Sequence, residues 1–151
     1  MIAIGSDHGG YALKQEIMRH LSSRGLAYQD YGCYSEESCD YPVYGKAVAH
    51  AVADGTCEKG ILICGTGIGI SLAANKIHGI RCAVCSDCFS AEMSRRHNNA
   101  NIIVFPARFI SNDEAVAMLD AYFSAQFEGG RHEHRIEKMA IPCCTAGETA
   151  K

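Results

Sequence analysis

The sequence contains no tryptophan, only three prolines and no apolar run long enough to span a membrane. Met1 is followed directly by a strand-like segment without a basic region, so no signal peptide is predicted. Neither sign of charge dominates, because 14 Lys and Arg oppose 17 Asp and Glu for a net charge of −3. Non-specific nucleic-acid binding depends on a basic surface that releases counterions. We therefore expect a cytoplasmic protein that binds neither nucleic acid nor membranes.

Cysteine is abundant, with nine residues in 151. An odd number, without a secretion signal and in a chain of this length, predicts free thiols in a reducing compartment. The spacing of Cys82, Cys85 and Cys88 is similar to that of a metal motif. Residues 80–85 nevertheless read as a strand, in which side chains three apart point to opposite faces. We therefore predict no metal site.

Short apolar runs alternate with helical patterns along the chain. Strands are expected at residues 2–5, 26–31, 60–64, 80–85 and 102–105. Helical patterns follow each of them, and a further one covers residues 131–139. Five such units predict an α/β, three-layer Rossmann-like fold with a five-stranded parallel sheet and an extra C-terminal helix. We expect the strand order 2-1-3-4-5, one domain over residues 1–140 and a tail at 141–151.

Two polar loops would meet where the winding of this sheet reverses, between the first and third strands. The second of these loops, Gly65-Thr66-Gly67-Ile68-Gly69, has three glycines at a strand-to-helix turn. Its free backbone amides could bind an anion, although a turn that only packs a helix on the sheet is the alternative. A dinucleotide fingerprint is excluded, because Ile70 and Leu72 stand where glycine is needed.

Titratable residues flank both loops. Cys64 directly precedes the glycine loop, whose amides would stabilise its thiolate so that it can act as a base. The alternative is an inert core cysteine. Asp7 and His8 follow the first strand and would face the same crevice.

Three arginines and a histidine complete the set. Arg131 and Arg135 lie four apart on one helical face and suit a phosphate, unless they are only a solvated pair. Arg108 follows the fifth strand at the same edge as Cys64. His97 closes the fourth helix, where capping and catalysis are both open. Such a set would bind a small phosphorylated molecule and transfer a proton between adjacent carbons, since an enediolate needs only oxyanion stabilisation.

Several sequence blocks together resemble the ribose-5-phosphate isomerase B family, which includes allose-6-phosphate isomerase and the galactose-6-phosphate isomerase subunits. The match runs from Met1 to about Met139 and is carried by residues 6–10, 40–42, 60–69, 74–76, 79–81, 94–98 and 128–132. The resemblance implies a cofactor-independent aldose–ketose isomerase of the pentose phosphate pathway. Its reaction would be the interconversion of ribose 5-phosphate and ribulose 5-phosphate.

The resemblance also implies a role for each matching residue. Cys64 would move the proton between C1 and C2, since Ile70 replaces the glutamate that another branch of the family uses. His97 would open the furanose ring, and Asp7 would handle hydroxyl protons. The remaining contacts would come from the amides of Gly65 to Gly69 with the Thr66 hydroxyl, and from His8, Tyr41, Asn98, Arg108, Arg131 and Arg135.

The family further implies a homodimer, or a dimer of dimers, with a composite site. His97, Asn98 and Arg108 would then come from the second subunit. Two other readings stay open from the residues alone. One is an isomerase of a six-carbon sugar phosphate, and the other is a flavodoxin-like module that binds a phosphorylated ligand without catalysis.

Overall fold

The structure, a computed structural model, describes residues 1–139, so the predicted tail at 141–151 lies outside the described residues. Strands and helices alternate as the sequence predicts. The strands are β1 (Ile2–Ser6), β2 (Tyr28–Asp30), β3 (Lys59–Cys64), β4 (Cys82–Val84) and β5 (Ile102–Pro106). The helices are η1 (His8–Gly10), α1 (Tyr11–Ser23), α2 (Tyr41–Ala53), α3 (Ile68–Ala74), α4 (Cys88–Arg96), α5 (Asn112–Ser124) and α6 (Arg131–Met139).

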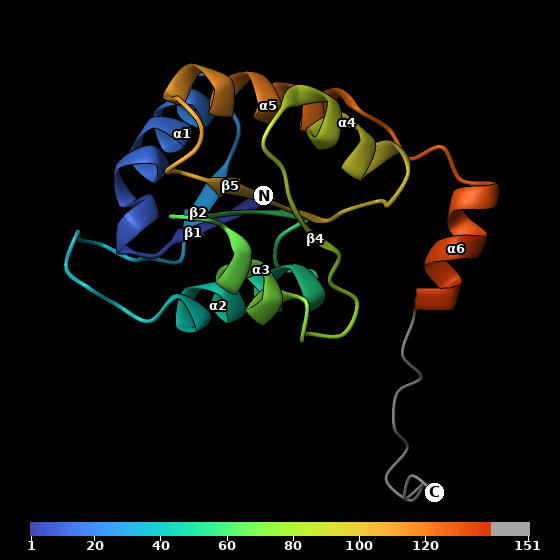
Figure 1. Ribbon diagram of the computed structural model, residues 1–151, viewed down its shortest axis with the longest axis horizontal. Helices are drawn as coiled ribbons and strands as arrows, with labels where there is room; N and C mark the ends of the chain where they lie inside the picture. Colours follow the sequence, from blue (N-terminus) through green and yellow to red (C-terminus); the bar gives the residue numbers. More distant parts are fainter. Residues whose placement is uncertain (140–151) are drawn as a thin grey trace, which may run out of the picture.

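The fold has three layers, as predicted. Helices α1, α4 and α5 cover one face of the sheet, and α2 and α3 cover the other (Figure 1). All five residues of β1 and of β5 are buried, as expected of parallel strands covered on both faces. No helix of α1 to α6 is long and apolar enough to cross a membrane.

The observed strand order is 2-1-3-5-4, so the predicted order 2-1-3-4-5 is wrong at its last two positions. Strand β5 is buried along its whole length and lies beside β3. Strand β4 has three residues, two half-buried and one exposed, and it lies at the edge. The more apolar strand therefore takes the inner place, because burying it on both faces removes more apolar surface from water.

The predicted opposition of Cys82 and Cys85 is confirmed. Cys85 belongs to the core beneath α1, α4 and α5, whereas Cys82 packs against the core on the α2 and α3 side. Two thiols on opposite faces of a sheet cannot bind the same ion. All seven cysteines among the described residues are free.

The reversal of winding lies between β1 and β3, as predicted, because exchanging the last two strands does not affect it. Strand β1 pairs in parallel with β2 on one side and with β3 on the other, and Ser6 lies opposite Ile63. The Asp7 amide donates to the Ile63 carbonyl at 3.2 Å. The loop after β1 is therefore fastened beside the end of β3.

A buried lysine anchors the loop that follows β2. The Lys14 ammonium, fully buried, donates to both Asp30 carboxylate oxygens at 2.7 and 2.8 Å and to the Cys33 carbonyl at 2.6 Å. Lys14 was not singled out from the sequence, although it lies three residues before Ile17 on the apolar side of α1. A lysine on the apolar side of a helix indicates a buried partner of opposite charge, because burying an unpaired ammonium group costs free energy.

Gly10 leaves no room for a side chain. A Cβ atom there would lie 2.5 Å from the Ile63 carbonyl oxygen, whereas one on Gly9 would have no neighbour nearer than 3.4 Å. We expect Gly10→Ala to lower the free energy of unfolding by about 1–3 kcal/mol, since the main chain of β3 must shift. Gly9→Ala is the matched control, and urea unfolding measures both. Equal losses in the two variants would contradict the packing explanation.

Candidate active site

The ends of β1 and β3 bring a thiol and a carboxylate into contact. The Cys64 thiol donates to Asp7 Oδ2 at 2.9 Å, and the two residues are only 7% and 6% exposed. The other carboxylate oxygen, Asp7 Oδ1, accepts from the Gly10 amide at 3.0 Å. Asp7 is thus held from both sides, with one oxygen directed at the sulfur.

This contact changes the expected state of the thiol. Burial raises the pKa of Cys64, and the Asp7 carboxylate raises it further, while the Gly67 and Thr66 amides lower it by less. The loop amides therefore favour the thiolate, as predicted, but burial and the Asp7 carboxylate outweigh them in the single chain. The reason is tertiary, because Asp7 and Cys64 are 57 residues apart and only strand pairing brings them together.

The glycine loop turns from β3 into α3, as its sequence predicts. Gly67 has a φ of +75°, which favours glycine, and the Thr66 hydroxyl accepts from the Ile68 amide at 3.3 Å. The ring of Tyr41 lies so close to Gly69 that a Cβ there would be 2.6 Å from the ring. Tyr41, predicted to line the pocket, therefore lies against this loop.

Arg108 and His8 lie at the same edge of the sheet. The Arg108 amide donates to the Gly65 carbonyl at 3.0 Å, and its Nε would be 3.1 Å from a Cβ on Gly65. His8 Nδ1 accepts from the Cys39 amide at 3.2 Å. One chain thus gathers Asp7, His8, Tyr41, residues 64–69 and Arg108 around the carboxyl ends of β1, β3 and β5.

His97 and Asn98 lie where the strands begin, at the end of the sheet opposite the carboxyl ends. They end α4 and precede β5, and the Gly60 amide at the start of β3 donates to the Asn101 carbonyl at 2.9 Å. Cys64 lies four positions after Gly60 along β3, roughly 13 Å at the usual rise of a strand. The structure therefore does not bring His97 to Cys64 of the same chain.

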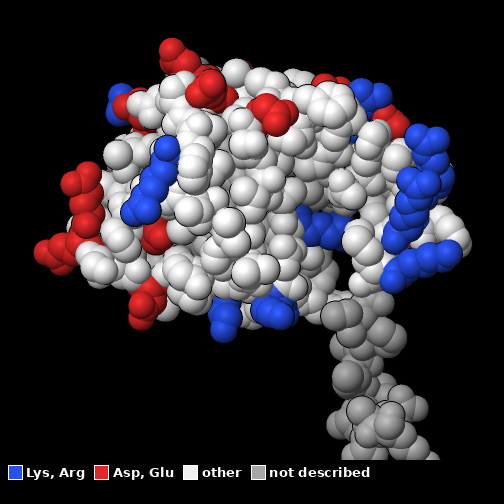
Figure 2. Space-filling view, viewed as in Figure 1, with Lys and Arg blue, Asp and Glu red and all other residues white. Residues whose placement is uncertain are grey.

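Arg131 and Arg135 accompany His97. Both are exposed on α6, which stands beside α4 at one side of the molecule (Figure 1). Figure 2 shows Lys and Arg side chains gathered over this helix. Arg131 and Arg135 therefore share one helical face, as predicted, but they lie apart from the Cys64 thiol of the same chain.

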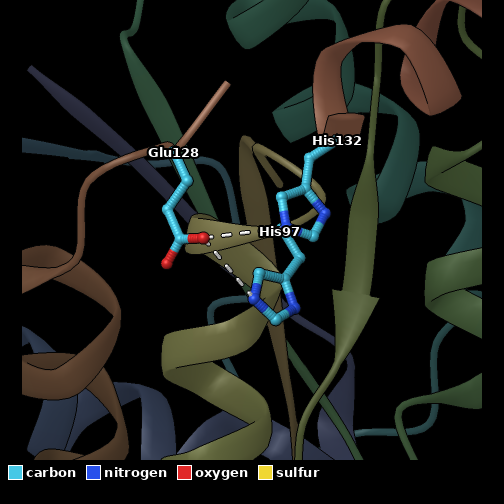
Figure 3. Close-up of side chains that lie close together, drawn as sticks. All are labelled: His97, Glu128 and His132. Carbon is cyan, nitrogen blue, oxygen red and sulfur yellow. Dashed lines mark ion pairs between the residues drawn. The ribbon is translucent and has the colours of Figure 1, made fainter. Parts of the chain in front are cut away.

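A cluster that was not predicted joins α6 to α4. The rings of His97 and His132 are stacked, with centroids 4.2 Å apart and planes 8° apart. Glu128 Oε2 lies 3.9 Å from His97 Nε2 and 3.7 Å from His132 Nε2 (Figure 3). Glu128 and His132 were not predicted as site residues. Both fall in the 128–132 block that carries the family resemblance, and that block was the feature of the sequence that could have indicated them.

The same three side chains are of types that hold divalent metal ions, and their donor atoms lie within 4.8 Å of one another. Two imidazoles bound to one ion direct their in-plane lone pairs at a common point. Parallel stacked rings direct them side by side instead. An ion would require one ring to turn, so the observed arrangement is a ring stack beside a carboxylate.

The charges of this cluster follow from its neighbours. Burial lowers the pKa of His132, and the positive charges of His97 and Arg131 lower it further. The hydrogen bond from Arg96 lowers the pKa of Glu128. At neutral pH the stack therefore places an uncharged His132 beside a carboxylate that Arg96 holds.

Taken together, the carboxyl edge has the features of a proton-transfer site for a small anionic molecule: a thiol–carboxylate pair, free amides and an arginine. The class is that of sugar-phosphate isomerases with a Rossmann-like α/β fold. The chain matches the family model described as Ribose/Galactose Isomerase over residues 2–139, and it belongs to that family.

Named relatives agree with this membership. Ribose-5-phosphate isomerase B of Escherichia coli (strain K12) is 52% identical over 138 residues, covering 91% of this chain and 93% of the relative. The solved structure of Clostridium thermocellum ribose-5-phosphate isomerase B has a TM-score of 0.91 and 51% identity, covering 91% of this chain and 93% of that one. Ribose-5-phosphate isomerase B from Mycoplasma genitalium, solved with bound ribulose-5-phosphate, has a TM-score of 0.87 and 39% identity, covering 91% and 92%.

The Asp7–Cys64 contact predicts a measurable change in thiol reactivity. Asp7→Asn removes the negative charge that disfavours the thiolate, so the pKa of Cys64 should fall. The pH dependence of iodoacetamide alkylation, followed by mass spectrometry of the Cys64 peptide, measures this shift. Exposed Cys88 is the internal reference. A Cys64 profile that stays in place, or moves to higher pH, would rule out the carboxylate as a cause.

Proposed function

We propose that this protein interconverts ribose 5-phosphate and ribulose 5-phosphate through an enediolate, without a cofactor. The observation that carries the proposal is the Cys64–Asp7 contact of 2.9 Å beside the glycine loop. Membership of the isomerase family and the similarity to ribose-5-phosphate isomerase B of other organisms support the same substrate. The seven free thiols within residues 1–139 suit the reducing compartment in which such a reaction of pentose phosphate metabolism would run.

Proton transfer would run through the thiol and its carboxylate partner. Cys64 passes its proton to Asp7, and the resulting thiolate removes the proton from C2 of the open-chain aldose. The electron pair of that C–H bond forms the enediolate double bond, and the carbonyl at C1 becomes an oxyanion. As the thiol returns the proton to C1, Asp7 gives its proton to O1 and takes the proton of the C2 hydroxyl, so that C2 becomes the carbonyl of the ketose. Asp7 then returns a proton to Cys64, which restores the starting pair.

The glycine loop would stabilise the charge that develops on oxygen. The amides of residues 65–69 and the Thr66 hydroxyl surround the end of β3, where the thiol lies. Donors fixed before the reaction stabilise an oxyanion more than water does, because they need not reorganise. Tyr41, packed against Gly69, would close one side of this pocket.

The ring-opening and phosphate-binding residues would come from a second copy of the chain. His97 and Asn98, with Arg131 and Arg135 beside them, lie at the opposite edge from Cys64 of their own chain. A two-fold homodimer, alone or paired into a tetramer, could place each set over its partner's thiol and form two equal sites. His8 and Arg108 lie at the carboxyl ends of the strands, beside Cys64 of their own chain. For Arg108 this differs from the expectation that it comes from the second subunit, because its amide bonds to Gly65 of the same chain.

Exposed apolar side chains support association at this edge. Six large, exposed apolar side chains lie at or after the carboxyl ends of the strands: Val43, Ile68, Leu72, Val84, Phe89 and Phe109. Phe89 and Phe109 are each 71% exposed. Apolar surface of this kind marks an interaction site, and a second copy would cover it.

A six-carbon sugar phosphate is the competing substrate, because an additional carbon changes the pocket length and not the chemistry. Relative turnover of ribose, allose and galactose phosphates separates the two. A binding module without catalysis would gain thermal stability with these ligands but exchange no proton at C2 with solvent.

Replacing the proposed base should abolish the reaction. We expect Cys64→Ala to lower kcat for ribose 5-phosphate by about 10²- to 10⁴-fold, the usual effect of losing a general base. Cys88→Ala, at an exposed cysteine, is the matched control and should retain full activity. A Cys64→Ala enzyme with undiminished kcat, or an inactive wild type, would refute the proposal.

The composite site predicts a reciprocal pattern in mixed dimers. A dimer of one Cys64→Ala chain and one His97→Ala chain, purified through two tags, should retain about half of the wild-type activity, because one of its two equivalent sites is intact.

The control is a dimer in which one chain carries both substitutions and the other is wild type. Each of its sites lacks one group, so it should be inactive. The opposite pattern, activity in the control and none in the first mixture, would show that each site lies within one chain.

A further inference from the structure

Helix α6 is attached to the body of the protein through a single buried side chain. Within residues 131–139, all of them described, only His132 is buried, at 7% exposure, while Arg131 and Arg135 are exposed. Ile136, one turn later on the same side of the helix, is half-buried, and the other residues of α6 are exposed. Whatever holds His132 also determines where the two arginines point.

His132 is held by the ring of His97. The planes of the two rings are 8° apart and their centroids 4.2 Å apart (Figure 3). The backbone of His97 is fixed by α4, since its amide donates to the Met93 carbonyl at 2.9 Å, but its side chain is 37% exposed. The stack is thus the contact that orients the imidazole of His97.

The segment before α6 is fastened to the same place. The Glu128 amide donates to the Arg96 carbonyl at 3.0 Å, and Arg96 Nε donates to the Glu128 carboxylate at 2.6 Å. Gly129 and Gly130 then adopt φ values of +66° and +57°. This turn, available to glycine, brings the chain back so that His132 lies over His97.

We propose that His132 is a positioning residue that joins ring opening to phosphate capture. Its ring sets the plane of His97 and, through α6, the place of Arg131 and Arg135. His97 and the two arginines then approach the partner's thiol together, as one rigid unit. This inference rests on the proposed function, which gives His97 and the two arginines their roles.

The contact itself indicates how His132 acts. Its Nε2 atom is buried and has no hydrogen-bond partner among the described residues, and Glu128 Oε2 is 3.7 Å away. What His132 gives to His97 is therefore a flat surface, not a hydrogen bond. A phenyl ring of similar shape offers the same surface, since aromatic rings also stack face to face with an offset.

Two reactions separate positioning from a general loss of structure. Turnover of ribose 5-phosphate needs ring opening, whereas exchange of the C1 proton of ribulose 5-phosphate with D₂O does not, because its phosphorylated O5 leaves no furanose ring to open. We expect His132→Ala to lower kcat for ribose 5-phosphate roughly 10- to 100-fold, as displaced catalytic groups do. The kcat of C1 exchange should stay at the wild-type value, while KM rises for both sugars through the displaced arginines.

Two further variants complete the design. His132→Phe should restore most of the ribose 5-phosphate turnover, and His134→Ala, an exposed histidine on the same helix, should match the wild type. Parallel loss of both reactions in His132→Ala would overturn the proposal, as would a His132→Phe enzyme as impaired as His132→Ala. If His132→Ala does not fold, the His132→Phe result alone decides.

Hydrogen exchange provides a readout that is independent of activity. Amides of residues 131–139 should exchange faster in His132→Ala than in His134→Ala, because the helix loses its anchor. A wild type that is inactive with ribose 5-phosphate would refute the proposed function and leave this result standing. Equal exchange in the two variants would refute the anchor whatever the activity.

Discussion

The pairing of β1 with β3 is the constraint on which the rest of the site depends. Because the strands are parallel and in register, their carboxyl ends meet, and the residues that follow them share one crevice. Asp7 and Cys64 are therefore forced together although they are far apart in the chain. Their contact raises the pKa of the Cys64 thiol and places a carboxylate oxygen 2.9 Å from its sulfur. The glycine loop then adds donors on the side where negative charge would form.

The same parallel geometry separates the remaining groups from the thiol. A helix that returns from the carboxyl edge of one strand to the start of the next must end at the opposite edge, and α4 ends there with His97. Helix α6 places Arg131 and Arg135 beside His97, at this same end of the molecule. The fold thus divides the chemistry between two ends of one molecule. We see the proposed dimer as a consequence of that division, with the His97–His132 stack keeping the second set together.

Several features could be predicted from the sequence because they are local. The glycine-rich turn after the third strand, the helix at residues 131–139 and the opposition of Cys82 and Cys85 follow from spacing along a few residues, and the structure confirms them. The order of β4 and β5 was wrong, since it depends on which strand buries more apolar surface against its neighbours. The effect of Asp7 on the pKa of Cys64 was not predicted, because the amides are local to Cys64 and the carboxylate is not.

By itself the sequence determined the alternation of strands and helices, the fold class, the glycine-rich turn after β3 and the family. These features depend on residue type and on spacing over a few residues, so they can be predicted without knowing which distant residues come into contact. Only the tertiary structure decided the strand order, the proton held between sulfur and carboxylate, and the stack that ties α6 to His97. Each of these joins side chains that strand pairing or helix packing brings close, and such contacts have no fixed separation in sequence.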